Sequence, residues 1–386
     1  MEKKNVPKIR FPGFTEPWEQ RKLKEVATFS KGQGYSKNDL CEQGTPIILY
    51  GRLYTKYQTT ITDVDTFVNP KSGSIYSTGK EVLVPASGET SEDIARASAV
   101  EESGILIGGD LNIIYPNKII EPTFLALLIS NGNQKKLLSK KAQGKSVVHL
   151  QNADLEEIEL IYPKREEQKC IIEYFKKIDN LITLHQRKLE NLKKQKKGLL
   201  QKMFPEKGKK VPEIRFPEFT DDWEQRKLNE FTMYSSSSLT VSDAKESGDY
   251  ELYDATGSIG YTNVTAQKEN YITIIKDGAG VGRVRILPKD TAFIGTMGAI
   301  TPINCDIHFL FNILVQTNFN SLISGGTIPH IYYNQYGKKK YYVPKLQEQQ
   351  KIGEFFKQID NLISLHQRKL EHLQKQKKAL LQQMFV

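Results

Sequence analysis

The chain has little of what several classes of protein require. Its three cysteines, Cys41, Cys170 and Cys305, lie far apart and show no CxxC spacing or Cys/His cluster. Neither a disulfide framework nor a zinc site is therefore expected. No apolar run approaches the roughly 20 residues that span a bilayer, and the charged first ten residues precede no apolar segment. We expect a protein of the reducing cytoplasm.

Complete motifs of common enzymes are also missing. The sequence has no P-loop, no GxSxG and no Asn-Pro-Pro-aromatic motif of amino-methyltransferases. In DGAGVGRVR, the third glycine of a dinucleotide-binding GxGxxG would fall on Arg283, which favours a tight turn. Such a turn could still bring backbone amides and Arg283 to a phosphate. The SGET segment at Ser87 is likewise better interpreted as a polar loop than as a nucleophile. We expect no catalytic residue, no metal site and no cofactor.

Two segments of the chain occur twice. Residues 6–23 recur at 211–228 with 14 of 18 positions identical and an offset of 205. Residues 163–204 recur at 344–385 with 30 of 42 positions identical and an offset of 181. A duplicated frame therefore carries two inserts, which differ in length and share little sequence.

The inserts have 139 and 115 residues: 24–162 and 229–343. Short apolar segments between Gly, Asn and Pro turns predict α/β domains with strands at 81–85, 105–107, 271–275 and 284–287. Helical spacing follows at 124–138 and 309–322. The predicted domain order is α/β domain, helix, α/β domain, helix: 1–162, 163–204, 205–343 and 344–386.

The longer repeat predicts a coiled-coil helix. Apolar residues alternate in steps of three and four, about 37 residues would extend about 55 Å, and two such helices in one chain would most simply pack together. The seam residues are Ile171, Phe175, Ile178, Ile182, Leu189 and Leu192 in the first copy, and Ile352, Phe356, Ile359, Ile363, Leu370 and Leu373 in the second.

The net charge of +10 lies on these helices. Residues 163–204 carry +7 and residues 344–386 carry +4, whereas the inserts carry −3 and −1. The surplus is explained equally well by a solvated coiled-coil exterior and by helices near phosphates or an acidic partner.

Within the inserts, basic and aromatic residues alternate in short segments of the kind that contacts phosphates and bases. His149 and His330 each follow a glycine by five residues, which favours a structural turn over a base contact. The candidate DNA-binding residues are Tyr50, Arg52, Tyr54, Lys56, Lys145 and His149 in the first insert, and Arg283, Arg285, His330 and Tyr332 in the second.

The repeats resemble those of the specificity subunit of type I restriction-modification systems, and the resemblance covers nearly the whole chain. It is carried by WEQRKL at 18–23 and 223–228, by the helix starts PKREEQKCI and PKLQEQQKI, and by FKKIDNLITLHQRKLENLKKQKKGLLQKMF with its second copy. Within the inserts, VLVPASGET and DGAGVGRVRI are similar to strand-turn segments of that family's target-recognition domains.

The resemblance implies an α/β fold with two target-recognition domains and two helices in a pseudo-two-fold antiparallel coiled coil. It also implies a non-catalytic subunit that recognises a bipartite site in double-stranded DNA. Two modification subunits would bind S-adenosylmethionine and methylate adenine, and restriction subunits would cleave DNA with ATP and Mg. The alternatives are a coiled-coil scaffold that binds only proteins and a self-contained methyltransferase or nuclease, which would need the missing motifs.

Overall fold

The computed structural model divides the chain into two compact units. Unit 1 comprises Met1–Leu184 together with Lys369–Val386, and unit 2 comprises His185–Arg368. Each unit therefore contains one insert and parts of both long helices. The structure describes residues 6–144, 147–206, 208–264 and 266–385.

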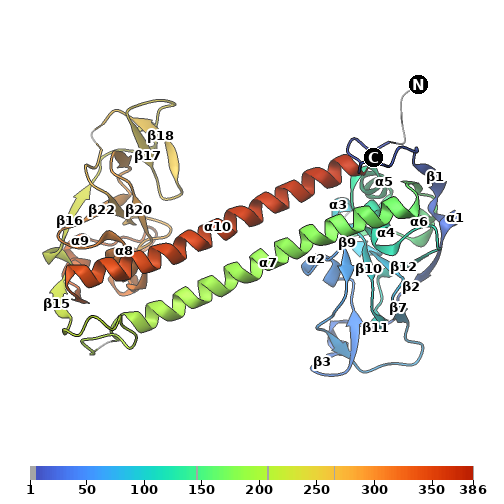
Figure 1. Ribbon diagram of the computed structural model, residues 1–386, viewed down its shortest axis with the longest axis horizontal. Helices are drawn as coiled ribbons and strands as arrows, with labels where there is room; N and C mark the ends of the chain where they lie inside the picture. The colour runs from blue at the N-terminus through green and yellow to red at the C-terminus, as the bar shows by residue number, and fades with distance from the viewer. Residues whose placement is uncertain (1–5, 145–146, 207, 265, 386) are drawn as a thin grey trace. The chain divides into compact units, whose positions relative to one another are not determined.

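Unit 1 is built on two five-stranded sheets (Figure 1). The only parallel pairs that the described strands show in it are β10 with β5 and β11 with β4. In order, the first sheet contains β2 (Ala27–Lys31), β12 (Leu111–Pro116), β8 (Val82–Pro85), β10 (Ser98–Val100) and β5 (Thr60–Ile61). The second contains β3 (Leu40–Cys41), β6 (Phe67–Val68), β4 (Thr45–Ile48), β11 (Ser103–Ile107) and β7 (Tyr76–Thr78).

Helix α4 (Pro122–Ser130) covers the first sheet of unit 1. Its sequence PTFLALLIS has no charged residue, and every side chain from Thr123 to Ser130 is buried. A helix that is apolar on all sides needs cover on all sides, which the sheet and the long helices provide. The helical spacing predicted for 124–138 is interrupted, since α4 ends before Asn131 and α5 spans Gly132–Lys141.

Short elements complete unit 1 and position its loops. They are α1 (Leu23–Val26), α2 (Arg52–Thr55), α3 (Ser91–Ile94), α6 (Asn152–Glu156) and two paired ribbons, β1 (Glu19–Lys22) with β14 (Glu159–Tyr162) and β9 (Ser87–Gly88) with β13 (Val148–His149).

Unit 2 has smaller sheets, of four and three strands, with α8 (Ile307–Gln316) against the larger one. The four strand segments predicted from the sequence are confirmed as β8, β11, β19 and β20. The larger sheet contains β16 (Thr232–Ser236), β22 (Met297–Pro302), β19 (Tyr271–Ile275) and β20 (Val284–Leu287), and the smaller contains β18 (Ser258–Thr262), β17 (Tyr250–Tyr253) and β21 (Thr291–Phe293). A ribbon joins β15 (Glu224–Lys227) to β23 (Lys340–Val343), and α9 spans Tyr333–Tyr336.

The two long helices, α7 (Arg165–Met203) and α10 (Leu346–Met384), run antiparallel within each unit. In unit 2, His185 Nδ1 lies 2.8 Å from His366 Nδ1, and Lys196 donates to both carboxylate oxygens of Asp360 at 2.6 and 2.7 Å. In unit 1 the equivalent lysine, Lys377, is paired with Asp179. Every residue of the predicted seam is buried or half-buried.

The same joint attaches each insert to its helix. Strand β1 pairs with β14 in the register in which β15 pairs with β23, so that Glu19 faces Tyr162 and Glu224 faces Val343. The identical WEQRKL motifs form these strands because each must pair with the strand that leads into a long helix.

A buried ion pair closes each joint. Arg10 donates two hydrogen bonds to Glu167, at 2.7 and 2.8 Å, and Arg215 donates two to Glu348, both at 2.7 Å. Both glutamates are almost fully buried, with 1% and 2% of their surface exposed. Such bidentate pairs fix orientation as well as distance.

Each long helix ends in the core of the unit that contains the other helix's start. Phe385, after α10, packs on Phe124 and Phe175 in unit 1, with ring centroids 5.8 and 6.4 Å away. Phe204, after α7, packs on Phe309 and Phe356 in unit 2 at 5.5 and 6.1 Å. The unit 1 core is therefore made from both ends of the chain.

Candidate nucleic-acid interface

The first group of predicted DNA-binding residues lies on and beside the short helix α2. Tyr50 is 40% exposed. Arg52 is held within the protein, since its guanidinium donates to Asp65, Gln58 and the carbonyl of Asp63. Lys56 is also paired with Asp65. The structure thus gives Arg52 a role in shaping its loop, whereas Tyr50 presents its ring to the surface.

Tyr54 connects this helix to the SGET loop. Its hydroxyl donates to the carbonyl of Ser87 at 2.8 Å, and burial raises the pKa of Tyr54 to about 12, so the donor stays protonated. A Cβ on Gly88 would lie 2.8 Å from the Tyr54 hydroxyl and 3.1 Å from the Ile94 Cβ, so a larger residue there would displace the Tyr54 side chain. Glycine in SGET therefore permits a close approach between two loops.

Arg96 belongs to this group, although the sequence pattern does not indicate it as a site residue. Its guanidinium lies 5.2 Å from the ring centroid of Tyr54 and 5.5 Å from that of Tyr57, within cation–π range. It also donates to the carbonyl of Leu53 and to Asp93. A lone arginine in ARASAV gives no signal of these partners, because all but Asp93 come from residues about 40 positions earlier.

His149 and His330 occupy the same loop in the two units. His149 exchanges two backbone hydrogen bonds with Gln143, and His330 exchanges two with Ser324, the residue 181 positions after Gln143. The glycine that follows the partner residue has a positive φ in both loops, and a Cβ on it would come within 2.4 Å of a backbone oxygen. The Gly-x4-His spacing thus corresponds to a hairpin in which the histidine pairs with the residue before the glycine, and contact of either histidine with a base stays a prediction. Lys145 lies outside the described residues.

Each of these hairpins lies against the strand-turn segment of its own unit, SGET in unit 1 and DGAG in unit 2. In unit 1, β13 pairs with β9, so that His149 faces Ser87 with Nδ1 3.4 Å from the serine Oγ. In unit 2, His330 bridges Asp277 of the DGAG turn, and the amide of Gly278 donates to the carbonyl of Pro329 at 2.9 Å. SGET and DGAG thus occupy equivalent positions.

The pair of Asp277 and His330 has a defined protonation pattern. The Asp277 carboxylate lies 2.7 Å from His330 Nδ1. Burial alone would raise the pKa of Asp277, but hydrogen bonds from His330 and Lys276 outweigh it and hold the pKa below its ordinary value. An ionised carboxylate only accepts, so Nδ1 carries a hydrogen and Nε2 remains for a ligand. The ring of Tyr332, 52% exposed, stacks on His330 with centroids 6.4 Å apart.

This pattern predicts a measurable pH dependence. Because the folded pKa of Asp277 is lowered, the pairing stabilises the fold above the ordinary aspartate pKa of about 3.9 and loses its effect as pH falls through the folded value. We expect NMR titration of the Asp277 carboxyl to give a pKa below about 3.9, and His330→Ala to raise it. His149→Ala is the matched control in unit 1. A rise in both variants, or in neither, would contradict the assignment.

Arg283 and Arg285 tie the segment after the DGAG turn to the loop at residues 255–256. Both guanidiniums donate to the carbonyl of Ala255, at 2.7 and 3.2 Å, and Arg285 also donates to that of Thr256. Arg283 remains exposed despite this bond. It therefore has donors left for a phosphate or a base edge, since a guanidinium has five.

Neither a metal site nor a membrane span is found among the residues with described positions. In that part of the chain, no three His, Cys, Asp or Glu side chains come together in a way that could hold a metal ion. None of the helices described has the length and apolar character needed to cross a membrane.

The family of the chain follows from comparison with known proteins. The model of the type I restriction modification DNA specificity domain matches twice, over residues 15–194 and 220–375. These matches cover most of the sequence, and the chain belongs to this family. The resemblance suggested by the repeats is confirmed, as is the α/β architecture with its duplicated frame and long helices.

Curated relatives share this assignment. The chain is similar to the type I restriction enzyme MjaVIII specificity subunit of Methanocaldococcus jannaschii, with 26% identity over 312 residues, 72% of this chain and 73% of the relative. It is also similar to the putative type I restriction enzyme MjaX specificity subunit of the same organism, with 24% identity over 405 residues, 98% of this chain and 95% of the relative.

Solved structures share the fold. The S subunit of the M. genitalium type I restriction-modification system matches with a TM-score of 0.69 and 16% identity, over 99% of both chains. A chain from a structure of a type I restriction-modification system, solved to explain complex assembly and conformational transition, matches with a TM-score of 0.54 and 15% identity, over 94% of this chain and 96% of that one.

Proposed function

We propose that this protein recognises a bipartite site in double-stranded DNA, one half-site through each insert, while its paired helices set the spacing between the halves. Family membership supports DNA recognition as the shared role. A subunit that recognises two different half-sites needs the same support twice with different contact residues on it, as the duplicated frame provides.

One observation carries this proposal. Each unit presents a Gly-x4-His hairpin beside a strand-turn loop, but the loop partner of the histidine is Ser87 in unit 1 and Asp277 in unit 2. Recognition of two different half-sites through base edges in the grooves requires different side chains, which here stand on the same backbone. A protein-binding scaffold would explain the helices without explaining these two paired loops.

The chemistry is assigned to partners. In the proposed complex this chain is non-catalytic and cytoplasmic and binds no cofactor. Two modification subunits bind S-adenosylmethionine and methylate adenine, and restriction subunits use ATP and Mg to cleave DNA. The relatives named as specificity subunits support this division of labour.

Methylation mapping tests the proposal. The chain is assembled with its modification subunit, and methylated adenines are mapped in DNA exposed to the complex. We expect one two-part sequence, and we expect exchange of residues 24–162 for a different insert to change only one of its halves. Random methylation, or a change in both halves, would sink the proposal. Assembly without sequence preference would favour the scaffold alternative.

The helices should act as a ruler. Deletion of the seven residues centred on each paired histidine, 182–188 and 363–369, removes one heptad from both helices and keeps the coiled-coil register. Each helix shortens by about 10 Å, close to the rise of three base pairs. We expect the preferred gap between half-sites to shorten by about three base pairs, or methylation to be lost. Active enzyme with an unchanged gap would rule out the ruler. A seven-residue deletion in α7 alone serves as the mismatched comparison.

A further inference from the structure

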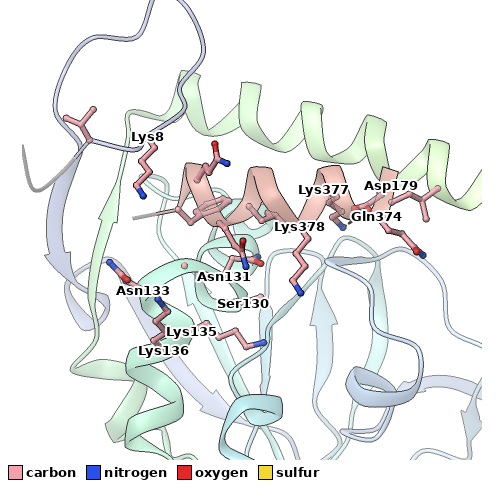
Figure 2. Close-up of a pocket in the computed structure, with 17 residues that line it drawn as sticks. Lys8, Ser130, Asn131, Asn133, Lys135, Lys136, Asp179, Gln374, Lys377 and Lys378 are labelled. Atoms are coloured by element: carbon pink, nitrogen blue, oxygen red, sulfur yellow. Dashed lines mark hydrogen bonds and ion pairs between the residues drawn. The ribbon is translucent and has the colours of Figure 1, made fainter. Parts of the chain in front are cut away.

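Unit 1 contains an open, basic cavity that the recognition loops do not form. Its volume is about 1040 Å³. Its walls are the last turns of α10, part of α7, the start of α5 and the segment that precedes β1 (Figure 2). In Figure 2, Lys8 and Lys378 extend from that segment and from α10 toward the side on which α5 carries Lys135 and Lys136.

Most of the charge in this cavity is uncompensated. The single carboxylate in its lining is that of Asp179, which is paired with Lys377. Within the described part of the chain, no carboxylate lies within 4.0 Å of the ammonium groups of Lys8, Lys135, Lys136 or Lys378. Four lysines around one opening repel one another unless an anion binds among them.

A hydrogen bond links the lining of this cavity to the candidate recognition loops of the same unit. Ser130, which lines it, accepts a hydrogen bond from the Tyr57 hydroxyl at 3.1 Å. Tyr57 lies under the same Arg96 guanidinium that covers Tyr54. Helix α5, which carries two of the lysines, also packs on α3 directly after the SGET loop. A DNA backbone that passes the recognition loops is therefore a better fit than a separate acidic protein.

Three of these four lysines have no lysine at the equivalent position of unit 2. The repeat places Lys197 at the position of Lys378, but Glu213 at the position of Lys8. The segment after α8, residues 317–323, contains no lysine and forms no counterpart of α5. The duplicated frame thus has an unequal charge at two otherwise equivalent positions.

We propose that this cavity binds backbone phosphates of duplex DNA beside the half-site recognised by unit 1, so that unit 1 supplies most of the salt-dependent affinity. The proposal rests on the proposed function. It adds that the loop residues recognise bases, whereas the cavity lysines bind phosphates without regard to sequence. Lysines contacting phosphates add affinity for every sequence, because the backbone carries no base information.

The test compares two sets of three Lys→Gln substitutions in the complex with the modification subunit. One set changes Lys135, Lys136 and Lys378. The control set changes Lys193, Lys194 and Lys197, which are exposed on α7. These substitutions remove the same amount of charge as the cavity set. Affinity is measured for a target duplex and an unrelated duplex between about 50 and 200 mM salt. Assembly is measured without DNA by light scattering.

We expect the cavity variant to lose affinity for both duplexes, by about tenfold or more at low salt, and to lower the slope of log affinity against log salt by about 2 to 3. Preference for the target should remain, and the control set should change the slope less. Equal slopes in the two variants, or an unchanged slope in the cavity variant, would overturn the proposal. Lost assembly with an unchanged slope would assign the cavity to an acidic protein surface. A wild-type complex without sequence preference would instead contradict the proposed function, and the slopes on unrelated DNA would still test the cavity.

Discussion

Replacement of Phe385 by alanine should destabilise unit 1 by about 3–5 kcal/mol, the usual cost of removing a buried phenylalanine, and should leave unit 2 intact. The ring is 2% exposed and packs on Phe124 and Phe175. The backbone around it is equally close, because a Cβ on Gly132 would lie 2.3 Å from the Phe385 carbonyl oxygen. Removing the ring takes away its contacts with these two phenylalanines in the buried core of unit 1.

Hydrogen exchange measures this effect unit by unit, which a single melting temperature cannot do for a chain with two units. We expect amides of α4, at Pro122–Ser130, to lose protection in Phe385→Ala while those of α8, at Ile307–Gln316, keep theirs. Phe204→Ala should give the converse pattern, since Phe204 packs on Phe309 and Phe356 in unit 2. Loss of protection in α8 but not in α4 for Phe385→Ala would contradict the assignment of the chain end to unit 1.

Glu348→Ala should destabilise unit 2 by about 3–5 kcal/mol, because it leaves a largely buried guanidinium without its partner. Glu348 is 2% exposed and accepts two hydrogen bonds from Arg215 and one from Trp223. An arginine guanidinium is not deprotonated in proteins, so Arg215 keeps its charge when Glu348 is removed. Glu167→Ala should cost unit 1 a similar amount through Arg10.

The chain offers its own probe for this measurement, since its two tryptophans, Trp18 and Trp223, lie in different units. With Trp18→Phe as background, tryptophan fluorescence during denaturation reports unit 2 alone. We expect the midpoint to fall in Glu348→Ala and to recover in the double variant Arg215→Met, Glu348→Met, because removing both charges together is often neutral or stabilising. An unchanged midpoint in the single variant would mean that the pair adds nothing to stability.

The duplicated frame of this protein was predictable because the sequence patterns that encode it are local and occur twice. The seam of α10 and the helix-starting Pro344 are encoded within one stretch of sequence, and the first copy at 163–204 repeats the same pattern. The strand order was not predictable, since strands of two to six residues such as β5 and β9 pair with partners distant in sequence. The 24-residue difference between the inserts corresponds to the larger sheets of unit 1.

The candidate site was predictable in its residue types more than in its contacts. Tyr50 and Tyr332 are exposed, as a DNA-contacting ring must be. The guanidinium of Arg52 instead donates hydrogen bonds to Asp65, Gln58 and the carbonyl of Asp63. These residues lie up to 13 positions away and form no recognisable motif with Arg52. The basic cavity of unit 1 joins Lys8, Lys135 and Lys378, and no local pattern connects positions so far apart.

The origin of the unit 1 core from both chain ends has a consequence for synthesis. Unit 2 is contiguous, His185–Arg368, whereas unit 1 needs Lys369–Val386. At about 5–20 residues per second, Phe124 and Phe175 lack the cover of Phe385 for at least about 10 s after they are translated. The unit whose synthesis begins first is therefore the last to be completed, and part of its aromatic core stays uncovered during that interval.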